Sequence, residues 1–391
     1  MENENVNNFQ EEEEYINQDE IAEVIDPEEL EGVDEDVEME TEEDDEEVVE
    51  NDSEVRFTKH TGSIFAISLN PINQCYALSG GEDDRGFIWN IVNGEVHAEL
   101  GGHTDSVVAV GFNITGEFAA TGGMDGVIKI WDSNTGKLVA NLDGPTEINW
   151  LQWHPKGNII LAGSNDGMLW MWLIPSGVLM NTFVGHQSSV SCGCFTPDGK
   201  NIVSASDDGS LIYWNPKTGA PIYVIKPNDS RWHSNPITCL SVSMERNLVV
   251  SGSADGTICL SQLQSGRIVQ ALDGHMDSVE DVSFCDCLPL MASASMDGTV
   301  KIWDLNNYSV RHVLNHDGAV IRLKWHQNSP IFTTCSNDKT VRMWDARSGT
   351  CLKVWKGHRK SILDFAMTPD GKVVATGGDD GESLVFMIDG E

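Results

Sequence analysis

Histidine and aspartate recur at a constant spacing along this chain. Such a pair could supply a general base with the acid that orients it, or two ligands of a metal ion. The first pair is His60 and Asp83, and Trp89 follows six residues after the aspartate. A catalytic or metal site would use one such pair. The number of repetitions therefore decides whether the pairs form a reactive site or a structural network.

The pattern occurs eight times. The aspartate is present in every copy, at Asp83, Asp125, Asp166, Asp208, Asp255, Asp297, Asp338 and Asp380. The histidine is present in seven copies, and Pro145 replaces it in the third: His60, His103, His186, His233, His275, His316 and His358. The tryptophan position is occupied by Trp89, Trp131, Trp172, Trp214, Ser261, Trp303, Trp344 and Phe386. Repetition in one register favours a structural network, and we expect no catalytic residue, metal site or cofactor.

Short strands must position these markers. Apolar and polar residues alternate in residues 106–112, and Gly-containing turns such as Asp125-Gly126 separate such runs. Period-two apolarity with tight turns is typical of antiparallel hairpins. Four strands in a unit that repeats every 41 to 47 residues indicate a β-propeller blade.

Residues 54–391 resemble the WD-repeat family, whose literal Trp-Asp pair occurs at Trp131, Trp303 and Trp344. The resemblance implies an all-β, eight-bladed WD40 β-propeller that acts as a rigid interaction platform without enzymatic activity. It also implies that each histidine bonds the turn aspartate and that a hydroxyl, such as that of Ser204 or Ser293, continues the chain to the tryptophan.

The last copy has only three strands before the chain stops, near residues 362–367, 373–376 and 384–388. Residues 53–58 have the pattern of the missing outer strand. We therefore predict that an N-terminal strand closes the ring, since pairing removes the open edge. The expected domains are a disordered acidic tail over residues 1–52 and the propeller over residues 53–391.

The negative charge is concentrated in the tail. The 391 residues hold 62 acids and 24 bases, a net charge of −38, and 27 of the acids precede Arg56, the first base. Such a balance argues against direct binding of nucleic acid or anionic membranes and favours a cationic partner. Because the sequence has neither an apolar span nor a signal sequence, we expect a cytoplasmic protein, with the nucleus as a second location. Because it has no paired-cysteine motif, we expect free cysteines. We also expect a monomer.

Acids also gather beside the repeated markers, in the loops that would share one face of the propeller. We predict that they bind a basic peptide, with Trp232 as an exposed aromatic contact. The predicted site comprises Glu82, Asp84, Asp105, Glu147, Asp207, Trp232, Asp277, Glu280, Asp317 and Asp379.

Residues 53–60, 80–84, 147–155, 161–172 and 362–366 resemble the angio-associated migratory cell protein family. The tail with eight copies is similar to fungal chaperones of ribosomal protein L-ten. The second resemblance implies a dedicated chaperone of a basic ribosomal protein in large-subunit assembly. The alternatives are a scaffold in signalling or cell migration and, from the Trp-Asp-x-Arg box at residues 344–347, a cullin-ligase substrate receptor.

Overall fold

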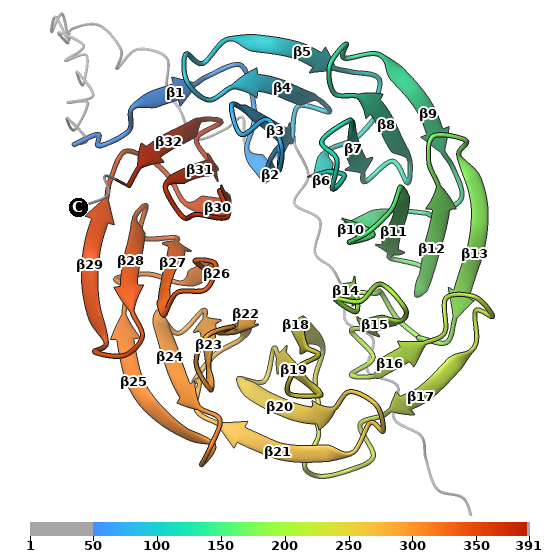
Figure 1. Cartoon of the computed structure of the whole chain (residues 1–391), viewed down its shortest axis with the longest axis vertical. Coiled ribbons are helices and arrows are strands. Elements are labelled where there is room, and N and C mark those ends of the chain that lie inside the picture. The colour runs from blue at the N-terminus through green and yellow to red at the C-terminus, as the bar shows by residue number, and fades with distance from the viewer. Residues whose placement is uncertain (1–49, 389–391) are drawn as a thin grey trace, which may run out of the picture. The chain divides into compact units, whose positions relative to one another are not determined.

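The computed structural model describes residues 50–388, which form eight four-stranded antiparallel sheets arranged as blades around a ring (Figure 1). This confirms the predicted eight-bladed all-β propeller. The predicted disordered tail lies outside the described residues as far as position 49. None of the described residues forms a helix that could cross a membrane.

The first four blades follow one another along the chain, and each begins at the centre of the ring and ends at its rim (Figure 1). Blade 1 consists of β2 (Ile64–Leu69), β3 (Tyr76–Gly81), β4 (Gly86–Asn90) and β5 (Val96–Leu100). Blade 2 consists of β6 (Val107–Phe112), β7 (Phe118–Gly123), β8 (Ile128–Asp132) and β9 (Leu138–Leu142). Blade 3 consists of β10 (Ile148–Trp153), β11 (Ile159–Ser164), β12 (Met168–Leu173) and β13 (Val178–Val184). Blade 4 consists of β14 (Cys192–Phe195), β15 (Ile202–Ala205), β16 (Leu211–Trp214) and β17 (Pro221–Ile225).

The remaining blades repeat this order, except that the last takes its outer strand from the N-terminal side of the domain. Blade 5 consists of β18 (Ile237–Ser243), β19 (Leu248–Ser253), β20 (Thr257–Gln262) and β21 (Ile268–Asp273). Blade 6 consists of β22 (Val279–Phe284), β23 (Leu290–Ser295), β24 (Thr299–Asp304) and β25 (Ser309–Asn315). Blade 7 consists of β26 (Val320–Trp325), β27 (Ile331–Ser336), β28 (Val341–Asp345) and β29 (Thr350–Trp355). Blade 8 consists of β30 (Ile362–Met367), β31 (Val373–Gly378), β32 (Ser383–Met387) and β1 (Val55–Phe57).

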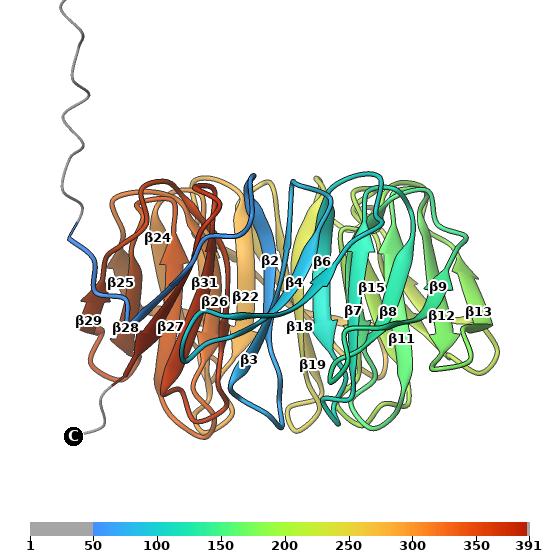
Figure 2. The ribbon, with the colours of Figure 1, turned by 90° about the horizontal axis from the view of Figure 1, so that it is seen from above.

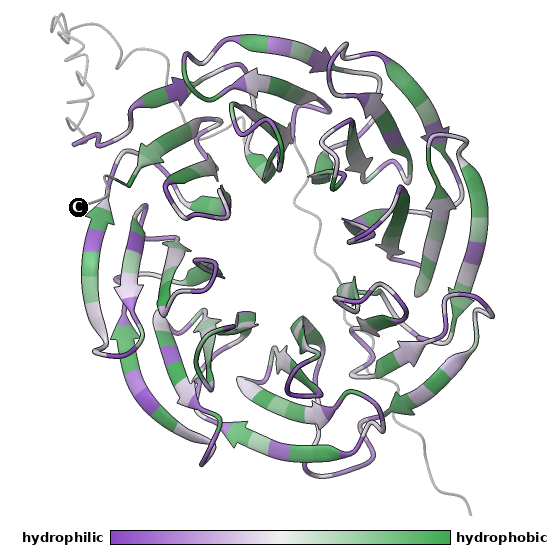
Figure 3. Cartoon of the chain, viewed as in Figure 1, coloured by the Kyte–Doolittle hydropathy of each residue, from purple (hydrophilic) through white to green (hydrophobic). Residues whose placement is uncertain are grey.

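Hydropathy follows the position of a strand within its blade. Inner strands such as β7 are buried on both faces and contain small and apolar residues, whereas the outer strand β9 is mostly exposed. Figure 3 shows apolar and polar residues alternating along several outer strands, with polar residues concentrated in the loops. The alternation arises because successive side chains of a strand point to opposite faces.

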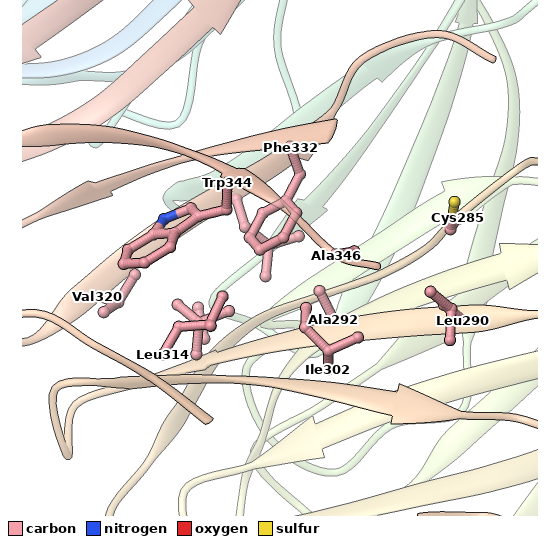
Figure 4. Close-up of a cluster of buried hydrophobic side chains, with 12 residues drawn as sticks. Cys285, Leu290, Ala292, Ile302, Leu314, Val320, Phe332, Trp344 and Ala346 are labelled. Carbon is pink, nitrogen blue, oxygen red and sulfur yellow. The ribbon is translucent and has the colours of Figure 1, made fainter. Parts of the chain in front are cut away.

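The hydrophobic core lies between adjacent blades. In the cluster shown in Figure 4, Leu314 of blade 6 packs with Phe332 and Trp344 of blade 7, and all three are at most 5% exposed. Each blade therefore buries its apolar faces against its neighbours and depends on them for stability.

Ring closure follows the prediction. Strand β1 pairs antiparallel with β32, and Phe57 lies opposite Ser383. Phe57 is 1% exposed and stacks on Trp89 of blade 1 with ring centroids 4.6 Å apart. The N-terminal strand thus closes blade 8 and also packs against blade 1.

Candidate functional site

The two ends of the propeller carry different loops. Because the strands of a blade alternate in direction, the turn that joins its second and third strands lies at the same end as the loop that connects one blade to the next (Figure 2). We call these the Asp turns and the connecting loops, because the repeated aspartates lie in the former and the repeated histidines in the latter. The hairpin loops between first and second strands and between third and fourth strands form the opposite end.

One backbone hydrogen bond joins the Asp turn to the connecting loop in every blade. In blade 2 the amide of Met124 donates to the carbonyl of Ser106 over 2.9 Å, and in blade 4 the amide of Asp207 donates to the carbonyl of Ser189 over 3.0 Å. The donor is always the residue before the turn aspartate: Glu82, Met124, Asn165, Asp207, Ala254, Met296, Asn337 or Asp379. The backbone at this position is therefore held against the connecting loop, while the type of side chain differs from blade to blade.

A buried polar chain supports this junction. In blade 2, His103 Nδ1 lies 3.0 Å from Asp125 Oδ2, and its Nε2 lies 2.9 Å from Thr121 Oγ1, to which the Trp131 indole donates over 3.0 Å. Burial lowers the pKa of His103, partly offset by Asp125, so this imidazole is neutral at pH 7.

Blades 6 and 7 repeat the full chain, through His275, Asp297, Ser293 and Trp303 and through His316, Asp338, Thr334 and Trp344. Blades 1 and 8 bond histidine to aspartate and to a hydroxyl, at His60 and Asp83 and at His358 and Asp380.

Two blades differ from the expected histidine–aspartate bond. In blade 4, His186 Nδ1 lies 2.7 Å from Ser210 Oγ and 3.8 Å from Asp208. In blade 5, His233 Nδ1 lies 2.7 Å from Thr257 Oγ1, and burial lowers the pKa of His233 to about 4. In both blades the histidine contacts the hydroxyl two residues after the aspartate. Blades 6 and 7 have Thr299 and Thr340 at the same position and keep the direct bond.

Blade 3 has no histidine, and a tryptophan occupies the space below its connecting loop. A Cβ atom at Gly144 would lie 2.6 Å from the Trp170 ring, which stacks on Trp172. The turn aspartate, Asp166, accepts a hydrogen bond from Ser164 instead. Aromatic packing therefore replaces the polar chain in this blade.

The prediction that Trp232 is exposed is wrong. Its side chain is 6% exposed, packs with Leu211 and Ile237, and donates from Nε1 to the carbonyl of Gly209 over 2.9 Å. The long connecting loop of blade 5 folds this indole back over the Asp turn of blade 4, so Trp232 anchors the loop.

The nine acids of the predicted site all lie at the end that holds the Asp turns and connecting loops, and none is fully buried. Five are exposed: Glu82, Asp105, Asp207, Asp277 and Asp317. Four are half-buried: Asp84, Glu147, Glu280 and Asp379. We call this end the acidic end.

Two of these acids meet at the junction of blades 1 and 8. Ser63 Oγ lies 3.0 Å from Glu82 Oε2 and 2.7 Å from Asp379 Oδ1. Lys360 Nζ lies 3.7 Å from the other oxygen of Asp379. The hydroxyl donates one proton, so the two carboxylates retain acceptor capacity for a cationic ligand.

The other acids differ in their surroundings. Asp317 is paired with Arg342, 2.9 Å away, and Glu147 accepts a hydrogen bond from Asn165. Burial, followed by the charge of Asp208, raises the pKa of Asp207. A cation near Asp207 would lower its pKa again, whereas Asp317 already has a cationic neighbour, Arg342, which it shares with Asp338.

The sequence-based site omitted a row of charged residues on three neighbouring inner strands. Asp281, Arg322 and Asp364 occupy the same position in the inner strands β22, β26 and β30, just after a register shift. Asp281 accepts a hydrogen bond from the Leu323 amide over 2.9 Å, and Asp364 accepts one from the Ile67 amide over 3.0 Å. Arg322 Nε lies 3.8 Å from Asp364. Their equal distance from the start of each inner strand was the available sequence signal.

Charge separates the two ends. The Asp turns and connecting loops from residue 58 onward contain 19 Asp and Glu against 8 Lys and Arg, whereas the opposite end contains 6 against 8. A cavity of about 490 Å³ at the opposite end is lined by Met244, Phe284, Trp325 and both Arg246 and Lys324. The electrostatics that would attract a basic chain are therefore confined to one end.

The remaining features are the Trp-Asp-x-Arg box, the cysteines and the residue types that could bind a metal ion. Arg347 of the Trp-Asp-x-Arg box lies at the opposite end and pairs with Asp345 over 2.8 Å. All nine cysteines are free thiols. Within residues 50–388, no three His, Cys, Asp or Glu side chains are grouped so that they could hold a metal ion.

Comparison with known proteins extends this picture. The WD domain, G-beta repeat family matches residues 94–132, 136–172, 177–215 and 349–384, and the WDR36/Utp21 first beta-propeller family matches residues 199–346. Human angio-associated migratory cell protein is 36% identical over 353 residues, covering 86% of this chain and 80% of that protein.

Two further relatives are a ribosome assembly protein and a protein whose structure contains a ribosomal-protein segment. Ribosome assembly protein SQT1 of Saccharomyces cerevisiae is 28% identical over 381 residues, covering 87% of this chain and 88% of that protein. The crystal structure of Chaetomium thermophilum Sqt1 bound to the N-terminus of ribosomal protein L10 has a TM-score of 0.82 and 27% identity, and covers 87% of this chain and all of that chain. With its repeats, its eight blades and these relatives, the chain belongs to the WD-repeat family and is a homologue of angio-associated migratory cell protein and Sqt1.

Proposed function

We propose that this protein is a dedicated chaperone that holds a basic segment of a ribosomal protein on its acidic end during large-subunit assembly. The solved Sqt1 homologue with the L10 N-terminus bound is the observation that carries this proposal. The uneven charge of the two ends supports it independently of any relative.

The geometry of the acidic end fits an extended basic chain. Backbone hydrogen bonds from Glu82, Asp207 and Asp379 fix the positions of these residues around the ring before a ligand arrives. A backbone that is held in place loses little conformational freedom on binding, and the combined potential of the carboxylates increases the rate of encounter. Paired charges then determine which segment is accepted.

A basic ribosomal protein segment needs countercharge until it reaches RNA. Carboxylates meet that need reversibly, because exposed ion pairs are individually weak and are screened by salt. RNA, with its dense negative charge, can therefore compete for the segment and release it from the chaperone.

The proposal is tested by capture from a lysate followed by mass spectrometry. The full chain should recover one basic large-subunit ribosomal protein. The Glu82→Lys, Asp207→Lys, Glu280→Lys variant should recover none. Glu117→Lys, Glu245→Lys, Asp286→Lys is the matched control, since it makes the same charge change in exposed residues of the opposite end.

Equal capture by both variants would refute binding at the acidic end. Recovery of cytoskeletal or receptor proteins without any ribosomal protein would instead support a scaffold in signalling or cell migration. The observation that favours this second candidate function is the 36% identity to angio-associated migratory cell protein.

A further inference from the structure

The bases of the acidic end are concentrated in one place. Half of the eight Lys and Arg in its loops belong to two adjacent segments, the Asp turn of blade 7 and the connecting loop into blade 8. These are Lys339, Lys356, Arg359 and Lys360, and all four are exposed. We call Lys339, Arg359 and Lys360 the basic seam.

Hydrogen bonds join the two segments into one surface. Ser361 Oγ donates to Asn337 Oδ1 in the Asp turn of blade 7. The carbonyl of the same serine accepts the Asp379 amide of blade 8 over 2.9 Å. The seam therefore lies directly beside Asp379, which shares Ser63 with Glu82.

Lys339 occupies a backbone conformation that a lysine rarely adopts. Its φ is 68°, and six of the other seven blades place a glycine with positive φ at this position, after the turn aspartate. A side chain there costs conformational energy that glycine avoids. Local strain that glycine would remove is typical of positions retained for binding.

The seam also retains unused positive charge. Among the described residues, neither Lys339 nor Arg359 forms an ion pair, and Lys360 has one contact, with Asp379 at 3.7 Å. Three exposed cations within a ring of carboxylates offer a binding position for a negative group, and a guanidinium binds carboxylate oxygens in pairs.

Building on the proposed function, we propose that the basic seam binds a carboxylate of the client segment. The preferred client is then bipolar: basic residues lie against the carboxylates of the acidic end, and an acidic residue at one end of the segment lies over blades 7 and 8. The contact sets the register of the bound chain, because a uniformly acidic ring would accept a basic segment in many registers.

Three synthetic peptides of identical composition test this inference on the full chain by fluorescence anisotropy. Each is capped at both ends and contains a run of lysines and one Glu pair, placed at the N-terminal end, in the middle or at the C-terminal end. One end-placed peptide should bind about fivefold more tightly than the middle-placed peptide, the size of one exposed ion pair. Arg359→Gln with Lys360→Gln should abolish the difference, and Lys137→Gln with Lys156→Gln at the opposite end should preserve it.

Lys339→Gly separates binding from folding. Because glycine suits the backbone conformation, this variant should melt at the same or a higher temperature while the preference for end-placed Glu declines. Equal binding of all three peptides, or a preference that survives in Arg359→Gln, Lys360→Gln, would overturn the inference.

A fourth peptide, with Gln replacing the Glu pair, distinguishes this failure from failure of the proposed function. If it binds and the Glu position has no effect, only the inference fails. If no peptide binds, two proposals are refuted: that the acidic end binds a basic segment, and that the basic seam binds a carboxylate of that segment.

Discussion

The two ends of the propeller are made by the same strands and the same kinds of tight turn, yet they differ in how their loops are held and charged. At the acidic end, a buried histidine network and one backbone bond per blade fix the loops, and acids outnumber bases by 19 to 8. The loops of the opposite end contain 6 acids and 8 bases. Backbone hydrogen bonds also join the hairpin loops of the opposite end, as from the Ile91 amide to the Cys75 carbonyl over 2.8 Å. The two ends therefore differ in the repeated buried histidines and in the excess of acid, which coincide at the acidic end.

Mild acid should produce the largest difference between the ends. Burial lowers the pKa of four histidines at the acidic end, His103, His233, His275 and His316, and of one at the opposite end, His326. A histidine with a lowered folded pKa stabilises the fold above its unfolded value and loses this contribution as pH falls toward the folded value. For His233, whose folded pKa is about 4, the loss begins near pH 6.5 and reaches about 3 kcal/mol.

Hydrogen exchange measured from about pH 7 down to about pH 5 would check this expectation. The connecting loops and Asp turns should lose protection before the hairpin loops of the opposite end. The turn carboxylates titrate in a separate window, since hydrogen bonds outweigh the effect of burial and lower the pKa of Asp297 to about 2. Simultaneous loss of protection at both ends would contradict the asymmetry.

Neutralising one carboxylate pair should have the next largest effect. Glu82→Gln with Asp379→Asn removes both charges beside Ser63 and should weaken binding of a lysine-rich peptide by about 30-fold, or ~2 kcal/mol. Glu245→Gln with Asp286→Asn at the opposite end should change the affinity less than twofold. Equal effects in titration calorimetry would show that only net charge matters.

A pair of histidine variants compares the two ends without changing a surface charge. His103→Ala and His326→Ala each remove a buried imidazole and its hydrogen bond to a threonine hydroxyl, Thr121 or Thr333, and Thr121 keeps the bond from the Trp131 indole. Each should cost about 1 to 3 kcal/mol in denaturant unfolding. Only His103→Ala should also weaken peptide binding, because it loosens a connecting loop of the acidic end.

Salt should have the smallest effect. Raising the ionic strength from about 50 to about 200 mM should weaken peptide binding roughly tenfold, since exposed pairs are screened. The unfolding free energy should change little, because the histidine network is buried. Salt-independent binding would indicate that apolar contacts, such as those available near Met244, dominate instead.

Most of the fold could be predicted from local patterns. Eight aspartates in one register required eight equivalent turns, and residues 53–58 had to pair because the last copy lacked an outer strand. The closing strand accordingly lies at Val55–Phe57, paired with β32. The general location of the predicted acids follows from the same register.

The contacts among those acids could not be predicted. Glu82 and Asp379 are 297 positions apart in sequence, and only ring closure brings both to Ser63. Trp232 lies within an unusually long loop, so the sequence predicted an exposed side chain, but its indole packs over the Asp turn of blade 4. Packing across a junction depends on the shapes of both blades, which a repeat pattern does not contain.

The sequence by itself determined the number of blades, the position of the turn aspartates and the excess of acid, because these depend on spacing and composition. The tertiary structure decided which acids share a ligand-accessible surface, which are paired with a basic neighbour such as Arg342, and where the cations of the basic seam meet. The reason is physical: periodicity specifies a strand and its facing direction, but electrostatic function depends on distances between side chains from different blades.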